Sequence, residues 1–365
     1  ERESQVETDD GLLMVFTSGT TGQPKGALLS HRNIIHSSLI EADTFESTPD
    51  DVYLNNMPIN HVGGAIVAGS TPIVSASTMV LLAKFSPTKT LQLIEQEGVS
   101  VLGQIPTQYT MEFNVPDYDK YDKSSLRVVH FGGSMPPKTT LRKVHASMCE
   151  NMFNCLGMTE AAGIVSYTPK GASIEVLSKS VGKGIPEVEW KLVDKKRRPV
   201  RRGEVGEIAY RGSTIIKEYY KLPQATAEAI DDEGWFYAGD LFYEDENGLL
   251  IFMGRKHDMF ITGGENVYPA EVEKAISSYE KVQTVAVVPV KDDVYGEIGC
   301  AYIIPKPGYT MEEEEITTFL KAKLAKYKIP KKFIFREALP LNATGKVDKK
   351  MLKKKIAEEI QALSS

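Results

Sequence analysis

The sequence is poor in cysteine and histidine, and it has no long apolar run. It contains three cysteines and six histidines in 365 residues, and Cys149, Cys155 and Cys300 lack the paired spacing of zinc ligands. This pattern excludes a disulfide framework and is typical of a reducing compartment, so we expect a cytoplasmic protein. The longest apolar stretch, residues 63–76, is interrupted by serine, threonine and proline. It is shorter than the about 20 residues that a transmembrane helix needs, so we expect no transmembrane segment.

An excess of positive charge is also lacking. Lysine and arginine total 43 against 49 aspartate and glutamate residues, for a net charge of −6, so we expect no nucleic-acid partner. What the chain does have is an ordinary globular composition, with 42% hydrophobic and 25% charged residues. At roughly 100–200 residues per domain, its length predicts two or three domains.

Short apolar runs alternate with helical patterns in the first half of the chain. The expected helices begin at a capping residue, Ser30, or with an early proline, which the first helical turn tolerates. Expected strands cover residues 12–16, 27–29, 52–56, 79–83, 100–102, 127–131 and 152–155, and further helices cover 87–97 and 136–148. Strands that alternate with helices favour an α/β fold with a mostly parallel sheet.

The pattern changes twice further along the chain. Residues 180–257 hold short apolar runs separated by glycine and charged turns, which predicts a small β-rich, barrel-like subdomain. Residues 258–365 combine helical patterns at 269–279 and 311–326 with strand patterns, which predicts a small α+β domain. We therefore expect three regions: an α/β subdomain over 1–179, a β-rich subdomain over 180–257 and a C-terminal α+β domain over 258–365.

A loop rich in glycine and hydroxyl groups directly follows the first expected strand. Residues 17–26 read TSGTTGQPKG. Its glycines let the backbone approach a ligand closely, and its hydroxyl and N–H groups can donate to phosphate oxygens, with Lys25 as a mobile positive charge. It is not a Walker A loop, because no helix begins with Gly-Lys-Ser or Gly-Lys-Thr. The composition favours a phosphate-binding loop over a plain polar turn.

Further motifs follow this loop in order along the chain. They are NHVGG from Asn60, GGS from Gly132, NCLGMTE from Asn154, GEVGE from Gly203, WFYAGD from Trp235, GRKHD from Gly254, GGENVYP from Gly263 and PLNATGK from Pro340. The series resembles the adenylate-forming superfamily of acyl-CoA synthetases, luciferases and peptide-synthetase adenylation domains, over nearly the whole chain. The resemblance implies that the C-terminal α+β domain is a mobile lid, with Asp258 at the expected hinge.

The resemblance implies a reaction in two steps. A carboxylate attacks the α-phosphate of ATP to give acyl-AMP and pyrophosphate, and a thiol then displaces AMP. Such chemistry depends on positioning and charge neutralisation. The expected catalytic residues are Lys346, which would approach the α-phosphate, together with Thr159, Glu160 and His61. Glu160 is also the expected Mg²⁺ ligand, because Mg²⁺ prefers hard oxygen donors.

A nucleotide site is implied by the same resemblance. Asp240 would accept hydrogen bonds from the ribose hydroxyls with support from Arg255, the turn at Gly132 would lie against adenine, and the turn at Gly263 would line the thiol tunnel. The full expected set is Thr17, Ser18, Gly19, Thr20, Thr21, Gly22, Lys25, Gly132, Gly133, Ser134, Asn154, Cys155, Leu156, Gly157, Asp240, Phe252, Arg255, Gly263 and Gly264.

The substrate acid and its acceptor are less closely defined. Val62 follows His61 where amino-acid-activating members of the superfamily place an aspartate, which favours a plain aliphatic, alicyclic or aryl carboxylic acid. No carrier domain follows Lys346, which favours free coenzyme A as acceptor. The expected function is therefore an AMP-forming acid–CoA ligase that uses ATP, Mg²⁺ and coenzyme A. Two alternatives stay open: a stand-alone enzyme that loads a carrier protein, and a truncated nucleotide-binding fragment with little activity.

The start of the chain is unusual for this superfamily. Glu1 stands where methionine is expected, and the phosphate loop begins as early as Thr17. Members of the superfamily carry a further segment before this loop, on the order of 100–200 residues. We therefore expect a truncated fold with an exposed apolar face, and self-association into a homo-oligomer through that face.

Overall fold

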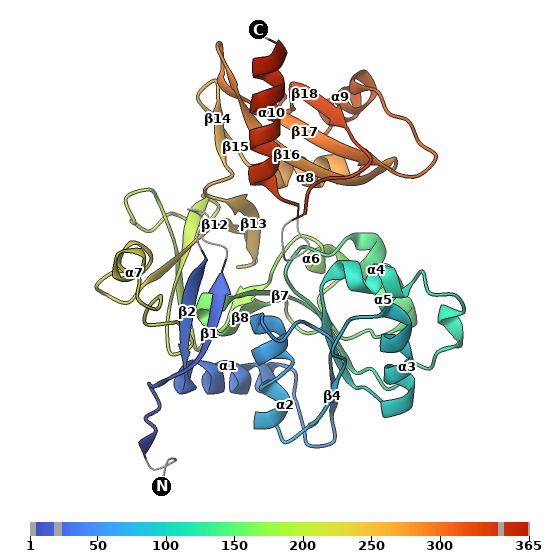
Figure 1. The fold of residues 1–365 in the computed structure, drawn as a ribbon, viewed down its shortest axis with the longest axis vertical. Helices are drawn as coiled ribbons and strands as arrows, with labels where there is room; N and C mark the ends of the chain where they lie inside the picture. Colours follow the sequence, from blue (N-terminus) through green and yellow to red (C-terminus); the bar gives the residue numbers. More distant parts are fainter. Residues whose placement is uncertain (1–4, 18–23, 342–346, 364–365) are drawn as a thin grey trace. The chain divides into compact units, whose positions relative to one another are not determined.

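A computed structural model describes residues 5–17, 24–341 and 347–363. The chain divides into two compact units, which are described here one at a time (Figure 1). The first unit is Glu1–Ala238 with Phe242–Phe252, and the second is Gly239–Leu241 with Met253–Ser365. The expected boundaries at residues 179 and 257 stay predictions. No helix in the described part of the chain is long and apolar enough to cross a membrane.

The first unit is built on a seven-stranded sheet of order β4-β3-β5-β6-β7-β8-β9. The strands are β3 (Val52–Asn55), β4 (Thr78–Leu81), β5 (Val101–Gln104), β6 (Val128–Phe131), β7 (Met152–Met158), β8 (Gly163–Tyr167) and β9 (Lys183–Gly184). The pairs from β4 to β7 are parallel and the last two are antiparallel. The expected α/β fold with a mostly parallel sheet is therefore confirmed. Strands β5 and β6 are buried along their whole length, as central strands of a parallel sheet usually are.

Two helices of the first unit begin where the sequence signals indicated, one directly after Ser30 and one at Pro87. A third begins at Lys138, two residues after the expected position 136, and the other helices were not predicted. The helices of this unit are α1 (His31–Thr44), α2 (Thr71–Val74), α3 (Pro87–Glu97), α4 (Pro106–Glu112), α5 (Lys138–Ser147), α6 (Ile174–Leu177) and α7 (Pro223–Ala229). The Ser30 hydroxyl accepts a hydrogen bond from the Asn33 backbone N–H (3.2 Å), and the Asn33 side chain accepts one from the Ser30 N–H (2.9 Å). This reciprocal pair satisfies two N–H groups that the first turn of α1 would otherwise leave unpaired.

Two smaller sheets complete the first unit and its border. Strands β1 (Gly11–Thr17) and β2 (Lys25–Ser30) form an antiparallel hairpin, which confirms the two strands expected there. A four-stranded sheet of order β10-β11-β12-β13 is formed by β10 (Glu189–Val193), β11 (Gly206–Arg211), β12 (Phe236–Glu244) and β13 (Leu250–Arg255). Strand β12 includes Asp240, so this expected site residue lies within a strand.

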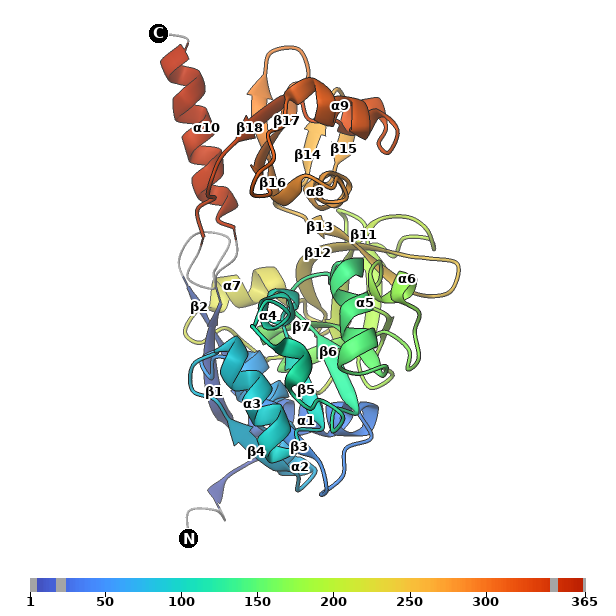
Figure 2. The same cartoon turned by 90° about the vertical axis from the view of Figure 1, so that its right-hand side faces the viewer.

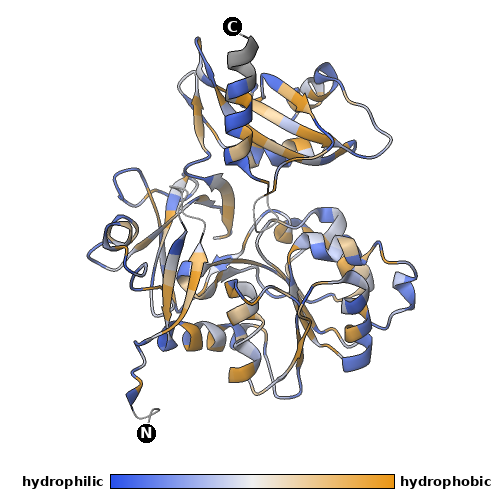
Figure 3. Ribbon diagram, in the orientation of Figure 1, coloured by the Kyte–Doolittle hydropathy of each residue, from blue (hydrophilic) through white to orange (hydrophobic). Residues whose placement is uncertain are grey.

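The second unit is a sheet covered by helices on both faces. Its elements are β14 (Phe260–Thr262), β15 (Glu265–Val267), α8 (Pro269–Ser277), β16 (Val282–Asp292), β17 (Gly296–Pro305), α9 (Glu313–Lys321), β18 (Lys332–Phe335) and α10 (Lys349–Leu363). In Figure 2, α8 and α9 lie on one side of this sheet and α10 lies on the other. Val287 belongs to the core under α8 and α9, whereas its neighbours Ala286 and Val288 pack with Leu352 of α10. This alternation is the two-residue period of strand β16. Figure 3 shows the strands of this sheet as mainly hydrophobic.

Candidate active site

The expected phosphate loop connects the two strands of the β1–β2 hairpin. Thr17, the last residue of β1, pairs with Lys25, the first residue of β2. Both side chains are half-buried. The five residues Ser18, Gly19, Thr20, Thr21 and Gly22 lie outside the described residues. Because β2 follows the loop, and no helix does, the hairpin agrees with the interpretation that this is not a Walker A loop.

A short segment far along the chain extends this hairpin. The Leu28 N–H donates to the Glu218 carbonyl oxygen (3.3 Å), and the Tyr220 N–H donates to the Gly26 carbonyl oxygen (2.8 Å). Tyr219, opposite Ala27, is thereby placed between two expected site residues. Its hydroxyl donates to Oε1 of Glu160 (2.8 Å), and Nζ of Lys25 lies 5.0 Å from the centre of its ring. The structure thus joins Lys25, Tyr219 and Glu160 in one cluster.

The hydroxyl of Tyr219 is suited to act as a hydrogen-bond donor in this cluster. Tyr219 is buried, and its burial, reinforced by the neighbouring Glu160 carboxylate, raises the pKa of the phenol well above its ordinary value. The phenol therefore stays protonated, and one oxygen of Glu160 stays hydrogen-bonded to it. The other oxygen of Glu160 has no such bond to Tyr219.

Glu160 is held in a tight turn between β7 and β8. Thr159, Glu160 and Ala161 form a single 3₁₀ turn, and Ala162 follows in the left-handed region (φ 57°, ψ 14°). The Glu160 carbonyl oxygen accepts a hydrogen bond from the Ile216 N–H (2.9 Å). Thr159 is buried, whereas Glu160 is half-buried. A non-glycine residue in this region of φ is strained, and such strain persists only where the surroundings impose it.

The glycine turn expected to lie against adenine follows β6. The Gly132 N–H donates to the Gln104 carbonyl oxygen (3.2 Å), so the turn is fixed to the end of the neighbouring strand β5. Gly133 has φ +77°, which glycine adopts without strain. Gly133 and Ser134 are exposed. The turn therefore presents an open surface at the carboxyl edge of the parallel strands, where α/β sheets usually bind ligands.

The expected nucleotide residues at the end of β7 differ in their surroundings. Asn154 is buried, and its Nδ2 donates to the Ser180 carbonyl oxygen (2.8 Å). Cys155 is buried too, and burial raises the pKa of its thiol well above the ordinary value. Leu156 is half-buried and Gly157 is exposed. Of these four, the last two are the more accessible to a nucleotide, and all four assignments stay predictions.

His61 lies on a separate segment of the first unit. It is exposed, and its Nδ1 accepts a hydrogen bond from the Gly63 N–H (3.1 Å). A neutral ring with this bond carries its proton on Nε2. The chain then continues into a π-helical turn, Gly63–Val67, a feature that is frequent near functional sites.

The residues expected to bind ribose and the glycines expected to line the thiol tunnel belong to the second unit, whereas Phe252 belongs to the first. Nε of Arg255 lies 3.4 Å from Oδ1 of Asp240, so the expected pair is adjacent. Gly263 and Gly264, with φ +57° and +89°, form the turn between β14 and β15. Phe252 packs against Phe242 in the first unit, with ring centres 5.3 Å apart. Lys346 lies outside the described residues.

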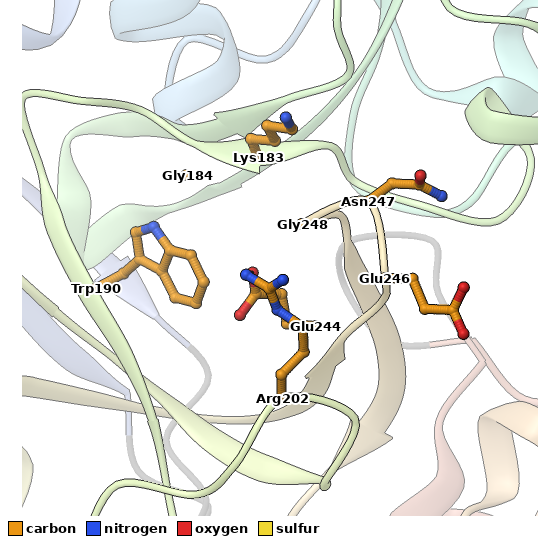
Figure 4. Close-up of a pocket in the computed structure, with 8 residues that line it drawn as sticks. All are labelled: Lys183, Gly184, Trp190, Arg202, Glu244, Glu246, Asn247 and Gly248. Carbon is orange, nitrogen blue, oxygen red and sulfur yellow. The ribbon is translucent and has the colours of Figure 1, made fainter.

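A solvent-open pocket of about 440 Å³ lies elsewhere on the first unit (Figure 4). Its wall includes Trp190 and the ion pair between Arg202 Nη2 and Glu244 Oε1 (2.9 Å). None of its lining residues belongs to the expected site. The site is therefore defined by the motif residues and by their contacts, and this pocket has no part in it.

Sequence reasoning missed Tyr219. Its neighbours, KEYYKLP, contain no polar cluster or glycine-rich loop that would indicate a site. The contact between Tyr219 and Glu160 depends on pairing between residues about 190 positions apart, Leu28 and Glu218. An aromatic residue in a strand-like segment is otherwise read as a core residue.

Comparisons with known proteins agree with the motif series. Residues 1–220 match the family described as AMP-binding enzyme, and residues 271–346 match the AMP-binding enzyme C-terminal domain. Indoleacetate–CoA ligase from Aromatoleum aromaticum is 35% identical over 98% of this chain and 70% of its own length. This chain spans about two thirds of the length of the first relatives that it matches.

Solved structures of similar fold include enzymes with bound nucleotide. ATP-bound MatB from Rhodopseudomonas palustris has a TM-score of 0.89 and 34% identity, over 96% of this chain and 69% of that one. O-succinylbenzoate coenzyme A synthetase from Bacillus subtilis, in complex with ATP and magnesium ion, has a TM-score of 0.82 and 29% identity, over 93% and 69%. The chain belongs to the AMP-binding enzyme family, the adenylate-forming enzymes, and specifically to its acyl-CoA synthetases, which are ligases that form carbon–sulfur bonds.

Proposed function

We propose that this chain activates a carboxylic acid with ATP and transfers the acyl group to coenzyme A. In the first step a carboxylate oxygen bonds to the α-phosphorus, and the bond to the β-phosphate breaks to release pyrophosphate. In the second step the thiol sulfur bonds to the acyl carbon, and the acyl–oxygen bond breaks to release AMP. The observation that carries this proposal is the cluster of Lys25, Tyr219 and Glu160 at the loop end of the β1–β2 hairpin.

In this proposal Lys25 binds the negatively charged phosphates, and Glu160 binds the positively charged Mg²⁺. Lys25, together with the loop residues, holds the β- and γ-phosphates through its positive charge. Glu160 is the ligand for Mg²⁺, and Tyr219 keeps one of its oxygens in place. When bound, Mg²⁺ neutralises charge on the phosphate oxygens.

The ligands available near Glu160 suit Mg²⁺, which can take most of its ligands from phosphate and water. They do not suit a metal ion that is bound by protein side chains alone. Within the described ranges, no group of three or more histidine, cysteine, aspartate or glutamate residues is arranged to hold a metal. Mg²⁺ is commonly bound by one or two carboxylates, with phosphates and water as the other ligands. A single glutamate beside a phosphate loop matches that pattern. Thr159, the residue before Glu160, is assigned a place beside the α-phosphate.

Residues of the second unit complete the proposed reaction. Asp240 accepts hydrogen bonds from the ribose hydroxyls, and Arg255 supports it from 3.4 Å. Lys346 stabilises the charge that develops at the α-phosphate during adenylation. Gly263 and Gly264 line the route of the thiol. Phe252 and the β6 and β7 residues around Gly132 and Leu156 are assigned to the nucleotide.

The proposed substrate is a plain carboxylic acid, and the proposed acceptor is coenzyme A. Val62, next to His61, is buried and apolar, so it offers no charge to the ammonium group of an amino acid. His61 is assigned to the region where the acyl group and the thiol meet. Relatives named as CoA ligases support coenzyme A over a carrier protein.

A panel of carboxylic acids, scored by acid-dependent pyrophosphate release, tests this function. The best acid is then assayed for AMP release with coenzyme A and with a phosphopantetheinyl carrier protein. Lys346→Ala is expected to lower the adenylation rate about 100–1000-fold. Lys354→Ala is the matched control, because Lys354 is largely exposed on α10. Full adenylation by Lys346→Ala would contradict the catalytic assignment, and ATP binding without pyrophosphate release for any acid would favour a nucleotide-binding fragment.

We also place the enzyme in the cytoplasm and propose that it self-associates. Cys149, Cys155 and Cys300, which all lie in the described part of the chain, are thiols and not disulfides, which supports a reducing compartment. Strand β4 supports self-association, because it is an edge strand of the large sheet and exposes Met79 and Leu81. An apolar edge strand pairs readily with a second copy of the same strand.

A further inference from the structure

Glu41 is a buried carboxyl group that no step of the proposed reaction uses. It lies in α1 and is fully buried. Burial raises the pKa of Glu41 to about 7, although hydrogen bonds from Thr71 and Ile164 oppose this rise. Removing a carboxyl group from water is unfavourable unless hydrogen bonds replace the lost hydration. Two of its partners, Ile164 and Thr71, therefore indicate what the carboxyl group does.

The first partner connects Glu41 to the turn that carries Glu160. Oε1 of Glu41 accepts a hydrogen bond from the Ile164 backbone N–H (3.3 Å), four residues after Glu160. The carboxyl group approaches the chain closely here, since a Cβ on Gly163 would lie 2.7 Å from the same oxygen. The strained residue Ala162 lies between this anchor and the 3₁₀ turn. Glu41 thus fixes the far end of the turn, while the Ile216 N–H holds the Glu160 carbonyl.

The second partner connects Glu41 to the segment that carries His61. The Thr71 hydroxyl donates to Oε2 of Glu41 (2.8 Å). Thr71 is fully buried and is the first residue of α2. The preceding residues run back through the π-helical turn Gly63–Val67 to His61. The two oxygens of one carboxyl group therefore connect the two segments that hold expected catalytic residues of the first unit.

We propose that Glu41 is a positioning residue that holds the Glu160 turn against the His61 segment, so that the Glu160 carboxylate is correctly placed for Mg²⁺. This inference rests on the proposed role of Glu160 as the Mg²⁺ ligand. Residues that orient metal ligands typically change metal affinity by about 10–100-fold when they are replaced. Glu41 acts through Ile164 and the turn, and it does not touch the substrate.

The test compares the affinity for ATP with Mg²⁺ and with EDTA, measured by isothermal titration calorimetry on the full chain. The ratio of the two dissociation constants reports the contribution of Mg²⁺ and does not require turnover. Glu41→Leu, which removes both hydrogen-bond acceptors, is expected to reduce this ratio about 10-fold. Glu41→Gln keeps an oxygen for the Ile164 N–H and an amide for Thr71, so it is expected to keep the parental ratio.

Two further variants separate positioning from stability. Thr71→Val removes the hydrogen bond to Oε2 of Glu41 with little change of side-chain shape. It is expected to reduce the ratio of the two dissociation constants about 3-fold. This variant therefore decides the question if Glu41→Leu does not fold. Glu112→Leu removes another fully buried carboxyl group of the same unit, one that accepts a hydrogen bond from the Gln104 side chain and not from the Glu160 turn. It is expected to lower the melting temperature and to leave the ratio unchanged.

The outcomes distinguish this inference from the proposed function. If Glu41→Leu and Thr71→Val lower only the melting temperature, or if Glu41→Gln loses as much as Glu41→Leu, the positioning role is wrong. Glu160→Gln is expected to abolish the Mg²⁺ contribution. If it does so while the Glu41 and Thr71 variants keep the parental ratio, only the positioning role is overturned. An unchanged ratio in Glu160→Gln overturns the proposed role of Glu160 and this inference with it.

Discussion

The hydroxyl of Tyr219 donates a hydrogen bond to Oε1 of Glu160 over 2.8 Å, and the same tyrosine ring lies beneath Nζ of Lys25. One side chain therefore contacts both the proposed Mg²⁺ ligand and the phosphate-loop lysine. Tyr219 is held there by backbone hydrogen bonds between β2 and the two residues that flank it, Glu218 and Tyr220. The hairpin and the Glu160 turn, which come from separate parts of the chain, are aligned through this residue.

Replacement of Tyr219 by phenylalanine tests this alignment. Tyr219→Phe keeps the ring under Lys25 and removes only the hydroxyl, so Glu160 loses its orienting bond. We expect acid-dependent pyrophosphate release to fall about 10-fold, with a higher Mg²⁺ concentration needed for half-maximal rate. Tyr220→Phe is the matched control, because the neighbouring Tyr220 is partly exposed. Equal rates for Tyr219→Phe and the parent would show that the bond has no part in catalysis.

Asp240 is expected to determine selectivity for the ribose of ATP. Asp240→Ala removes the acceptor for the ribose hydroxyls, and hydrogen bonds to a charged group contribute about 1.5–3 kcal/mol each. The parent protein should therefore favour ATP over 2′-deoxyATP and 3′-deoxyATP by about 10-fold or more, and Asp240→Ala should lose this preference. The measurement is kcat/KM for each nucleotide.

Asp245→Ala controls for a general loss of structure in this experiment. Asp245 accepts hydrogen bonds from the Asn247 and Leu249 backbone N–H groups within its own turn, so its replacement affects folding and not ribose selectivity. A nucleotide preference that survives in Asp240→Ala would place the ribose elsewhere.

Local signals in the sequence predicted much of the fold. The Ser30 cap and the early proline of α3 predicted two helices, because capping depends on a few adjacent residues. The continuous apolar run of β6 predicted a central strand for the same kind of reason. The motif series also singled out Lys25 and Glu160, and the structure brings both into contact with Tyr219; their roles stay predictions.

These local signals could not predict contacts between segments that are distant in the sequence. The roles inferred here for Tyr219 and Glu41 depend on strand and helix packing that no local pattern encodes. Asn154 illustrates the reverse case, since its motif predicts a ligand contact while its amide is directed to the Ser180 carbonyl. A motif identifies a segment of the site, but the orientation of each side chain depends on what the segment packs against.

Self-association through β4 is expected to depend on its exposed apolar residues. Leu81→Lys places a charge on the edge strand, and edge charges oppose pairing with a second copy. Sedimentation analysis of the parent should show a mass that rises with concentration, and Leu81→Lys should shift the distribution toward monomer. Lys84→Glu, in the loop after β4, is the control for a change in surface charge alone. A parent that stays monomeric at high concentration would contradict the proposal.

Glu112 is expected to make the first unit less stable as the pH rises. Glu112 is fully buried in α4; burial raises its pKa to about 8, and the hydrogen bond from the Gln104 side chain opposes this rise. In the unfolded chain a glutamate has a pKa of about 4.3. Between these two values the folded state retains a proton that the unfolded state has lost. Raising the pH through this window therefore lowers the free energy of unfolding, by at most about 1.4 kcal/mol per pH unit.

Glu112→Gln isolates this contribution, because its amide oxygen still accepts from Gln104 but cannot ionise. Urea unfolding at pH 5 and pH 7.5 should show that the variant resembles the parent at the lower pH and exceeds it by more than about 1 kcal/mol at the higher pH. Glu41, whose pKa is raised to about 7, acts in the same direction but is present in both proteins, so it cancels in the difference. Glu97→Gln, at an exposed position of α3, should show no such difference. A parent and Glu112→Gln variant with equal pH dependence would mean that Glu112 is ionised in the folded protein at neutral pH.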